Sequence, residues 1–182
     1  MTILEVLAAL SAAAAAGIRI GLPLSIVGLL HGELWSQVPI LSLLHHRVWL
    51  AIFISWSLLE VFGSKQLLGQ RAIQLVQLIL SPGAGALMGW TAAKAIGLNF
   101  SPLWILGLVG GLLALVLKLV QVGWFFRLGG LPMWAMFLED LLCVCLVLFA
   151  LKSPENGGFI ALLLLWMAVR SSNGWRNWYK GR

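Results

Sequence analysis

Four ionisable residues lie deep inside apolar segments of the 182-residue sequence: Arg19, Lys118, Glu139 and Asp140. A charge at the centre of a lipid bilayer costs at least about 2.5 to 3.5 kcal/mol, so charged side chains at that depth face the interior of a helix bundle and pair with one another. Two cations and two carboxylates can neutralise each other, which predicts a buried cluster of these four residues. Such a cluster can bind an ion or polar solute, or it can consist of ion pairs that only hold helices in register.

Other residues that could do chemistry carry weaker signals. Glu60 and Lys65 form a secondary candidate pair near the end of one apolar segment. His31, His45 and His46 lie in or beside one predicted loop, and adjacent histidines on a helix point about 100° apart, so no metal site is expected. The sequence has no HExxH, Gly-x-Ser-x-Gly or phosphate-binding loop motif, so we expect no enzyme and assign no catalytic residue or cofactor.

The composition predicts that lipid surrounds these charges. Hydrophobic residues make up 61% of the chain and charged residues 10%, which is too much apolar surface for one soluble core. The net charge of +6 is explained by basic residues at the ends of membrane spans, so no nucleic-acid partner is expected. The expected partner of this protein is therefore the lipid bilayer.

The apolar segments predict an all-α fold, a polytopic membrane helix bundle that forms one membrane domain over residues 1–182. We expect about six transmembrane helices, over residues 3–30, 47–62, 83–97, 102–126, 132–152 and 157–171. The first span should kink near mid-membrane because Pro23 removes a backbone hydrogen bond. Residues 1–97 and 98–182 then hold three spans each, which permits a 3+3 inverted repeat.

Residues 66–80 are too short for a confident crossing. Gln66, Gln70, Gln74 and Gln77 follow one helical stripe, so we expect an interfacial or half-inserted helix that turns back at Pro82. Its glutamine face should meet water or protein.

The distribution of Lys and Arg predicts the orientation, because cytoplasmic loops carry the excess. An even number of spans places both termini on the same side of the membrane. Seven Lys and Arg residues lie on that side: Lys65, Arg71, Arg127, Arg170, Arg176, Lys180 and Arg182. Three lie on the other side: Arg47, Lys94 and Lys152. Both termini are therefore expected in the cytoplasm.

Small residues recur four apart in three of the spans. The pairs are Gly17 and Gly21, Gly85 and Gly89, and Gly107 and Gly111. Such pairs allow two helix backbones to approach closely. Packing within one chain is the favoured interpretation, and a homodimer seam or a contact with other membrane subunits is the alternative.

Several short motifs together resemble a bacterial integral membrane family catalogued as domain of unknown function 4126. They are Gly17-Ile-Arg19-Ile-Gly21-Leu-Pro23, Leu59-Glu60 with Lys65, Ser81-Pro82-Gly83-Ala-Gly85, Gly110-Gly111 with Lys118, and Leu138-Glu139-Asp140. The resemblance implies a compact helical membrane domain and brings no agreed substrate. The chain departs from the family pattern ahead of Lys118, where relatives often have a His and this chain reads Ala114-Leu-Val-Leu-Lys118. It departs again before Lys65, where relatives often have Asp and this chain has Ser64.

Two functions remain open. The first is a small transporter or channel that moves an ion or polar solute through the buried charges. The second is a non-catalytic assembly factor or accessory subunit of a larger membrane complex. The Trp-rich tail suggests a cyanobacterial source, and hence a multi-pass protein of an inner or thylakoid membrane.

Overall fold

The computed structural model describes residues 3–37, 41–43, 45–63, 67–95, 103–130 and 132–180. The described residues form α-helices and two short 3-10 helices, with no strand among them. The elements are α1 (Ile3–Ile18), α2 (Gly21–His31), η1 (Gly32–Gln37), η2 (Leu41–Leu43), α3 (His46–Gly63), α4 (Leu67–Ala95), α5 (Leu103–Leu128), α6 (Met133–Lys152) and α7 (Pro154–Lys180). The all-α prediction is confirmed.

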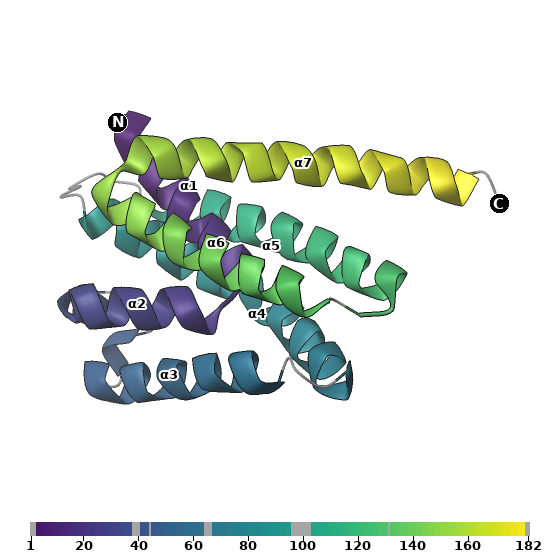
Figure 1. The fold of residues 1–182 in the computed structure, drawn as a ribbon. Coiled ribbons are helices and arrows are strands. Elements are labelled where there is room, and N and C mark those ends of the chain that lie inside the picture. The colour runs from purple at the N-terminus through teal and green to yellow at the C-terminus, as the bar shows by residue number, and fades with distance from the viewer. Residues whose placement is uncertain are drawn as a thin grey trace.

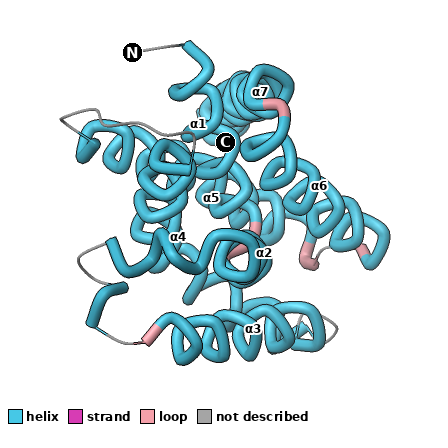
Figure 2. The backbone as a smooth tube through the Cα atoms, turned by 90° about the vertical axis from the view of Figure 1, so that its left-hand side faces the viewer, coloured by secondary structure: helices cyan, strands magenta, loops and turns pink. Residues whose placement is uncertain are grey.

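The helix α1 occupies the middle of the bundle. It packs against α4, α5, α6 and α7, while α2 and α3 form a pair on one side (Figures 1 and 2). The alanine run from Ala12 to Ala16 is at most 1% exposed. Side chains this small let four helices crowd around one axis, which explains why an alanine tract lies at the core.

The first apolar segment is two helices that fold back on each other. The α-helical conformation stops at Arg19 and Ile20, and α2 runs back toward the end of the bundle where α1 began (Figure 1). Ala12 of α1 and Val27 of α2 accordingly line the same small internal space. With 16 and 11 residues, the two helices are only about 24 and 16 Å long. The expectation of one kinked span over residues 3–30 is therefore wrong.

Pro23 explains where the second helix begins. It lies in the first turn of α2, where the backbone N–H groups have no partner within the helix in any case. The missing N–H of proline therefore costs nothing there, and the interruption falls before Pro23 instead of at it.

The helix α4 contradicts a second expectation. It continues through Pro82 without turning back, so residues 66–80 and 83–97 do not form separate elements within the described range. Proline leaves the carbonyl of Leu78 without its usual N–H donor, and the Ser81 hydroxyl donates to that carbonyl at 3.3 Å. The glutamine stripe behaves as expected, because Gln70, Gln74 and Gln77 are buried against protein.

Close backbone contacts join α4 to α5. A Cβ atom on Gly111 would lie 2.7 Å from the carbonyl oxygen of Pro82, and one on Gly89 would lie 3.0 Å from that of Leu106. Gly17 and Gly85 make similar approaches to α5, and Gly21 to α3, whereas Gly107 is in ordinary van der Waals contact with α4. The paired glycines therefore serve packing within the chain, as the favoured interpretation expected.

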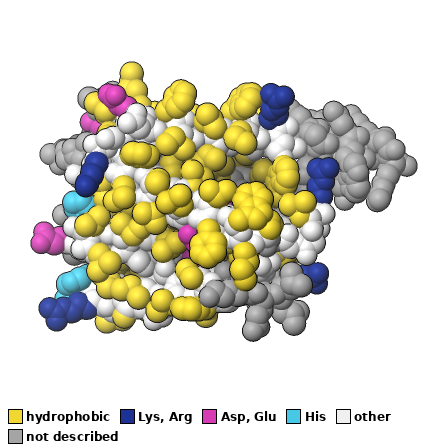
Figure 3. All heavy atoms as spheres, in the orientation of Figure 1, with side chains coloured by type: hydrophobic (Ala, Val, Ile, Leu, Met, Phe, Trp, Pro, Cys, Tyr) yellow, Lys and Arg dark blue, Asp and Glu magenta, His cyan; other side chains and the backbone are white. Residues whose placement is uncertain are grey.

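The molecule is a membrane-spanning helical protein. Three described helical segments are long and apolar enough to cross a bilayer, namely Gly69–Ala95, Trp104–Leu128 and Met133–Lys152. Hydrophobic side chains cover the middle of the face in Figure 3, whereas charged side chains gather toward its two ends. This pattern is the one expected for a lipid-facing surface. The inverted repeat stays a prediction.

Two glycines offer a matched test of the α4–α5 packing. We expect Gly111→Ala to lower stability by about 1 to 3 kcal/mol, because its methyl group would meet the Pro82 carbonyl. Gly83→Ala should raise stability by about 0.5 to 1 kcal/mol, because a Cβ there has no neighbour within 4 Å and alanine favours the helix. Unfolding of the purified protein in detergent measures both. Equal effects of the two substitutions would contradict the packing.

Candidate functional site at the turn between α1 and α2

The turn between α1 and α2 leaves two helix ends inside the bundle. The last carbonyls of α1 and the first N–H groups of α2 have no partner within their own helices. The aligned peptide dipoles also place partial negative charge at the end of α1 and partial positive charge at the start of α2. In an apolar interior these groups need partners from other helices.

Lys118 of α5 supplies the partner for the end of α1. Its ammonium Nζ donates to the Ile18 carbonyl at 3.0 Å and to Oε1 of Gln121 at 2.8 Å. The side chain is fully buried. A positive charge therefore meets the negative end of the α1 dipole, which is the favourable arrangement.

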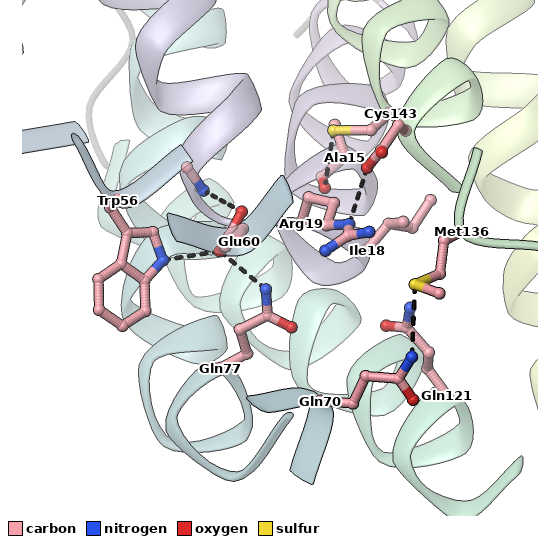
Figure 4. Close-up of polar contacts among 12 residues, drawn as sticks. Ala15, Ile18, Arg19, Trp56, Glu60, Gln70, Gln77, Gln121, Met136 and Cys143 are labelled. Atoms are coloured by element: carbon pink, nitrogen blue, oxygen red, sulfur yellow. Dashed lines mark hydrogen bonds and ion pairs between the residues drawn. The ribbon is translucent and has the colours of Figure 1, made fainter. Parts of the chain in front are cut away.

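Glu60 of α3 supplies the partner for the start of α2. Its Oε2 accepts the Gly21 backbone N–H at 3.1 Å, and its Oε1 accepts Nε1 of Trp56 at 2.6 Å and Nε2 of Gln77 at 2.7 Å (Figure 4). The carboxylate is fully buried. Position 21 has to be glycine, because a Cβ there would lie 2.7 Å from the Ser57 backbone. The four groups join α2, α3 and α4 at one point.

Arg19 lies on the turn itself and pairs with α6. Its Nε is 2.9 Å from Oδ1 of Asp140. Neither atom makes a well-aligned hydrogen bond, so the contact is an ion pair held mainly by charge. Arg19 is buried, whereas a quarter of the Asp140 side chain is exposed.

Glu139 faces a groove beyond the end of α1. The groove has a volume of about 240 Å³ and lies between α5, α6 and α7, with Ile18 at its inner end. Its polar lining includes Gln121, the same residue that accepts a hydrogen bond from Lys118. Because α1 stops at the turn, no central helix fills this half of the bundle, which explains the space.

The structure brings the predicted charges to one turn but pairs them differently. Arg19 contacts Asp140 as expected, whereas both hydrogen-bond acceptors of Lys118 are uncharged. No carboxylate among the described residues lies in ion-pair contact with Lys118. The hydrogen-bond acceptors of Lys118 are thus a backbone carbonyl and an amide, because the end of α1 offers it a carbonyl, and its pairing with a carboxylate stays a prediction.

Glu60 belongs at the centre of the site, not beside it. Lys65, its expected partner, lies outside the described residues. Sequence reasoning missed Trp56, Gln77 and Gln121 as partners. Helical spacing could have indicated two of them, since Trp56 stands four residues before Glu60 and Gln121 three after Lys118.

The histidines lie elsewhere. His31 and His46 line a separate pocket of about 470 Å³ with Glu33, where α2 ends and α3 begins. Within the described part of the chain, no three His, Cys, Asp or Glu side chains are grouped closely enough to hold a metal ion.

Comparison with known proteins identifies a family. A family model described as Domain of unknown function (DUF4126) matches residues 6–173, and the chain belongs to that family. The chain matches no curated protein and no solved structure. The match includes every residue of the turn and its partners.

The pair of Arg19 and Asp140 can be tested by double substitution. We expect Arg19→Met alone to lower stability by about 3 kcal/mol, because it leaves the Asp140 carboxylate in the bundle without a counter-ion. Arg19→Met combined with Asp140→Leu should recover most of that loss. Unfolding of each variant in detergent measures the coupling. Arg170→Met, which removes an exposed cation on α7, is the control and should change little. Additive losses in the double variant would contradict the pair.

Proposed function

We propose that this member of the family moves an ion or small polar solute across its membrane through the site at the turn between α1 and α2. The observation that carries the proposal is the interruption itself, with charged side chains at both helix ends inside the bundle. Interrupted helices with their polar ends near mid-membrane form the binding sites of many transporters. The proposal assigns no catalytic role to any residue.

The concentration of charge supports a role beyond packing. Arg19, Glu60, Lys118, Glu139 and Asp140 come from four different structural segments and surround one turn. Ionisable groups are costly in a membrane interior, and an apolar helix crossing would hold the bundle together without them. A scaffold could be built with an uninterrupted apolar helix in place of this turn and its charged partners.

Spaces on both sides of the turn also support transport. The groove at Glu139 lies beyond the end of α1, and the pocket of His31 and Glu33 lies at the opposite end of α2. A carrier needs access to its site from each side in turn. The accessory-subunit alternative fits less well, because the paired glycines of the described helices contact other helices of the same chain.

The hairpin also changes the proposed membrane orientation. Since α1 and α2 enter and leave at one end, we propose five crossings, made by α3 to α7. The start of α1 lies at the opposite end from the finish of α7 (Figure 1). The helix ends near Arg71, Arg127 and Arg170 share one end of the bundle. We therefore propose a cytoplasmic C-terminus, by the excess of Lys and Arg, and an N-terminus on the other side.

Solute flux tests the proposed function. We expect proteoliposomes to swell faster than empty liposomes in at least one of sodium, potassium or choline thiocyanate, glycine or sucrose, as followed by light scattering. Glu60→Gln should slow that swelling by roughly tenfold, because it removes the charge that meets the start of α2. Glu155→Gln, at the exposed start of α7, is the control and should leave the rate unchanged. Folded protein that swells no faster than empty liposomes in any solute would favour the accessory-subunit function.

Accessibility of the two termini tests the orientation. We expect a cysteine added before Met1 to react with an impermeant maleimide in intact cells, and one added after Arg182 to react only after lysis. Endogenous Cys143 is buried, and Cys143→Ser with Cys145→Ser removes any background. Protection of both added cysteines in intact cells would restore the six-span orientation with both termini inside.

A further inference from the structure

The groove beside α1 has the chemical character of a binding site for a hydrophobic cation. Of its eleven lining residues, the apolar ones predominate and come from α1, α5, α6 and α7: Ile18, Leu117, Val120, Trp124, Leu142, Leu164, Met167 and Ala168. The polar members are Gln121, Glu139 and Ser171. Ligand sites typically combine apolar walls with a few polar groups that fix orientation.

Among the described residues on these walls Glu139 is the acidic group, and Gln121 is its polar neighbour there. No cation of the described residues lies in ion-pair contact with it, since Arg19 pairs with Asp140 and Lys118 bonds to uncharged oxygens. Trp124, whose Nε1 donates to Ser171 at 2.8 Å, adds an aromatic ring to the groove. A carboxylate and an aromatic ring in one apolar groove are the combination that attracts organic ammonium groups.

The charge balance around the turn points to the same class of ligand. With all five groups ionised, Arg19 and Lys118 contribute two positive charges, whereas Glu60, Glu139 and Asp140 contribute three negative charges. The difference is one negative charge. Of the three carboxylates, Glu139 is the one in direct contact with neither a cation nor a helix end, and Arg19 and Lys118 attract it only through space. One monovalent cation in the groove would neutralise the cluster.

The groove is large enough for a ligand of this kind. Its volume of about 240 Å³ is far above the roughly 10 to 15 Å³ that one water molecule requires. Apolar walls would leave a small inorganic ion poorly solvated, but they favour a ligand with a hydrophobic body.

We infer that the groove binds a monovalent organic cation, an amine or quaternary ammonium with a hydrophobic body, and that Glu139 is its counter-ion. The inference rests on the proposed transport function and names the substrate class of the same site. The ligand's body would lie against α5 and α7, and its positive charge would lie beside α6. Glu139 would then also select cations over neutral and anionic molecules.

Equilibrium dialysis of the detergent-solubilised full chain against radiolabelled benzyltrimethylammonium tests the inference. We expect saturable binding that unlabelled benzyltrimethylammonium displaces and its uncharged isostere neopentylbenzene does not. Glu139→Gln should weaken binding at least about tenfold, and Glu139→Asp should retain it within about threefold because the charge remains. Glu155→Gln, a carboxylate outside the groove, should bind as the wild type does. Circular dichroism of each variant establishes that it is folded.

Three outcomes would overturn the inference: no saturable binding, undiminished binding by folded Glu139→Gln, or equal displacement by neopentylbenzene. The last would make the groove a site for lipid chains. Because dialysis requires no transport, its result is separate from the flux result. Flux of another solute without cation binding overturns the inference alone, whereas cation binding without any flux overturns the proposed function alone.

Discussion

The structure depends on one constraint, that two helix ends inside an apolar bundle must find hydrogen-bond partners. The turn at Arg19 and Ile20 exposes carbonyls of α1 and N–H groups of α2 where lipid and hydrophobic side chains offer nothing. Lys118 and Glu60 reach these ends from α5 and α3, and each brings the charge that the local dipole favours. The turn is stable only because these two helices lie beside it.

The small residues around α1 make that approach possible. The alanines of α1 let α5 and α6 come close, and Gly21 lets α3 come close enough for Glu60 to accept its N–H. Larger side chains at these positions would separate the helices and withdraw the partners from the turn. Close packing of the helices and hydrogen bonding of the backbone groups at the turn therefore depend on each other in this bundle.

The same interruption creates the space in which chemistry can occur. A continuous helix in place of α1 and α2 would fill the bundle from end to end, whereas the turn leaves a groove beyond Ile18. Charged side chains lie near the groove because the helix ends at the turn need charged hydrogen-bond partners. The charged side chains that satisfy the free backbone groups at the turn also form an environment that can bind an ion. Binding sites at interrupted membrane helices are commonly built in this way. The α2–α3 pair lies to one side of the central helices.

The sequence by itself determined the membrane helices, the buried position of the charges and the direction of the glutamine stripe. Each follows from local composition or helical period, because the cost of a polar group in lipid does not depend on the details of the fold. It also indicated that Arg19 would find a carboxylate, which Asp140 supplies.

The tertiary structure decided the connections. Whether the chain bends at Arg19 depends on Lys118 and Glu60. Lys118 lies 100 residues from Ile18 in the sequence, and Glu60 lies 39 residues from Gly21. Whether α4 passes through Pro82 depends on the Ser81 hydroxyl reaching the carbonyl that proline leaves without a donor. Local pattern shows that a proline or glycine can interrupt a helix, but only the surrounding helices determine whether the freed backbone groups are satisfied in the bent or the straight form.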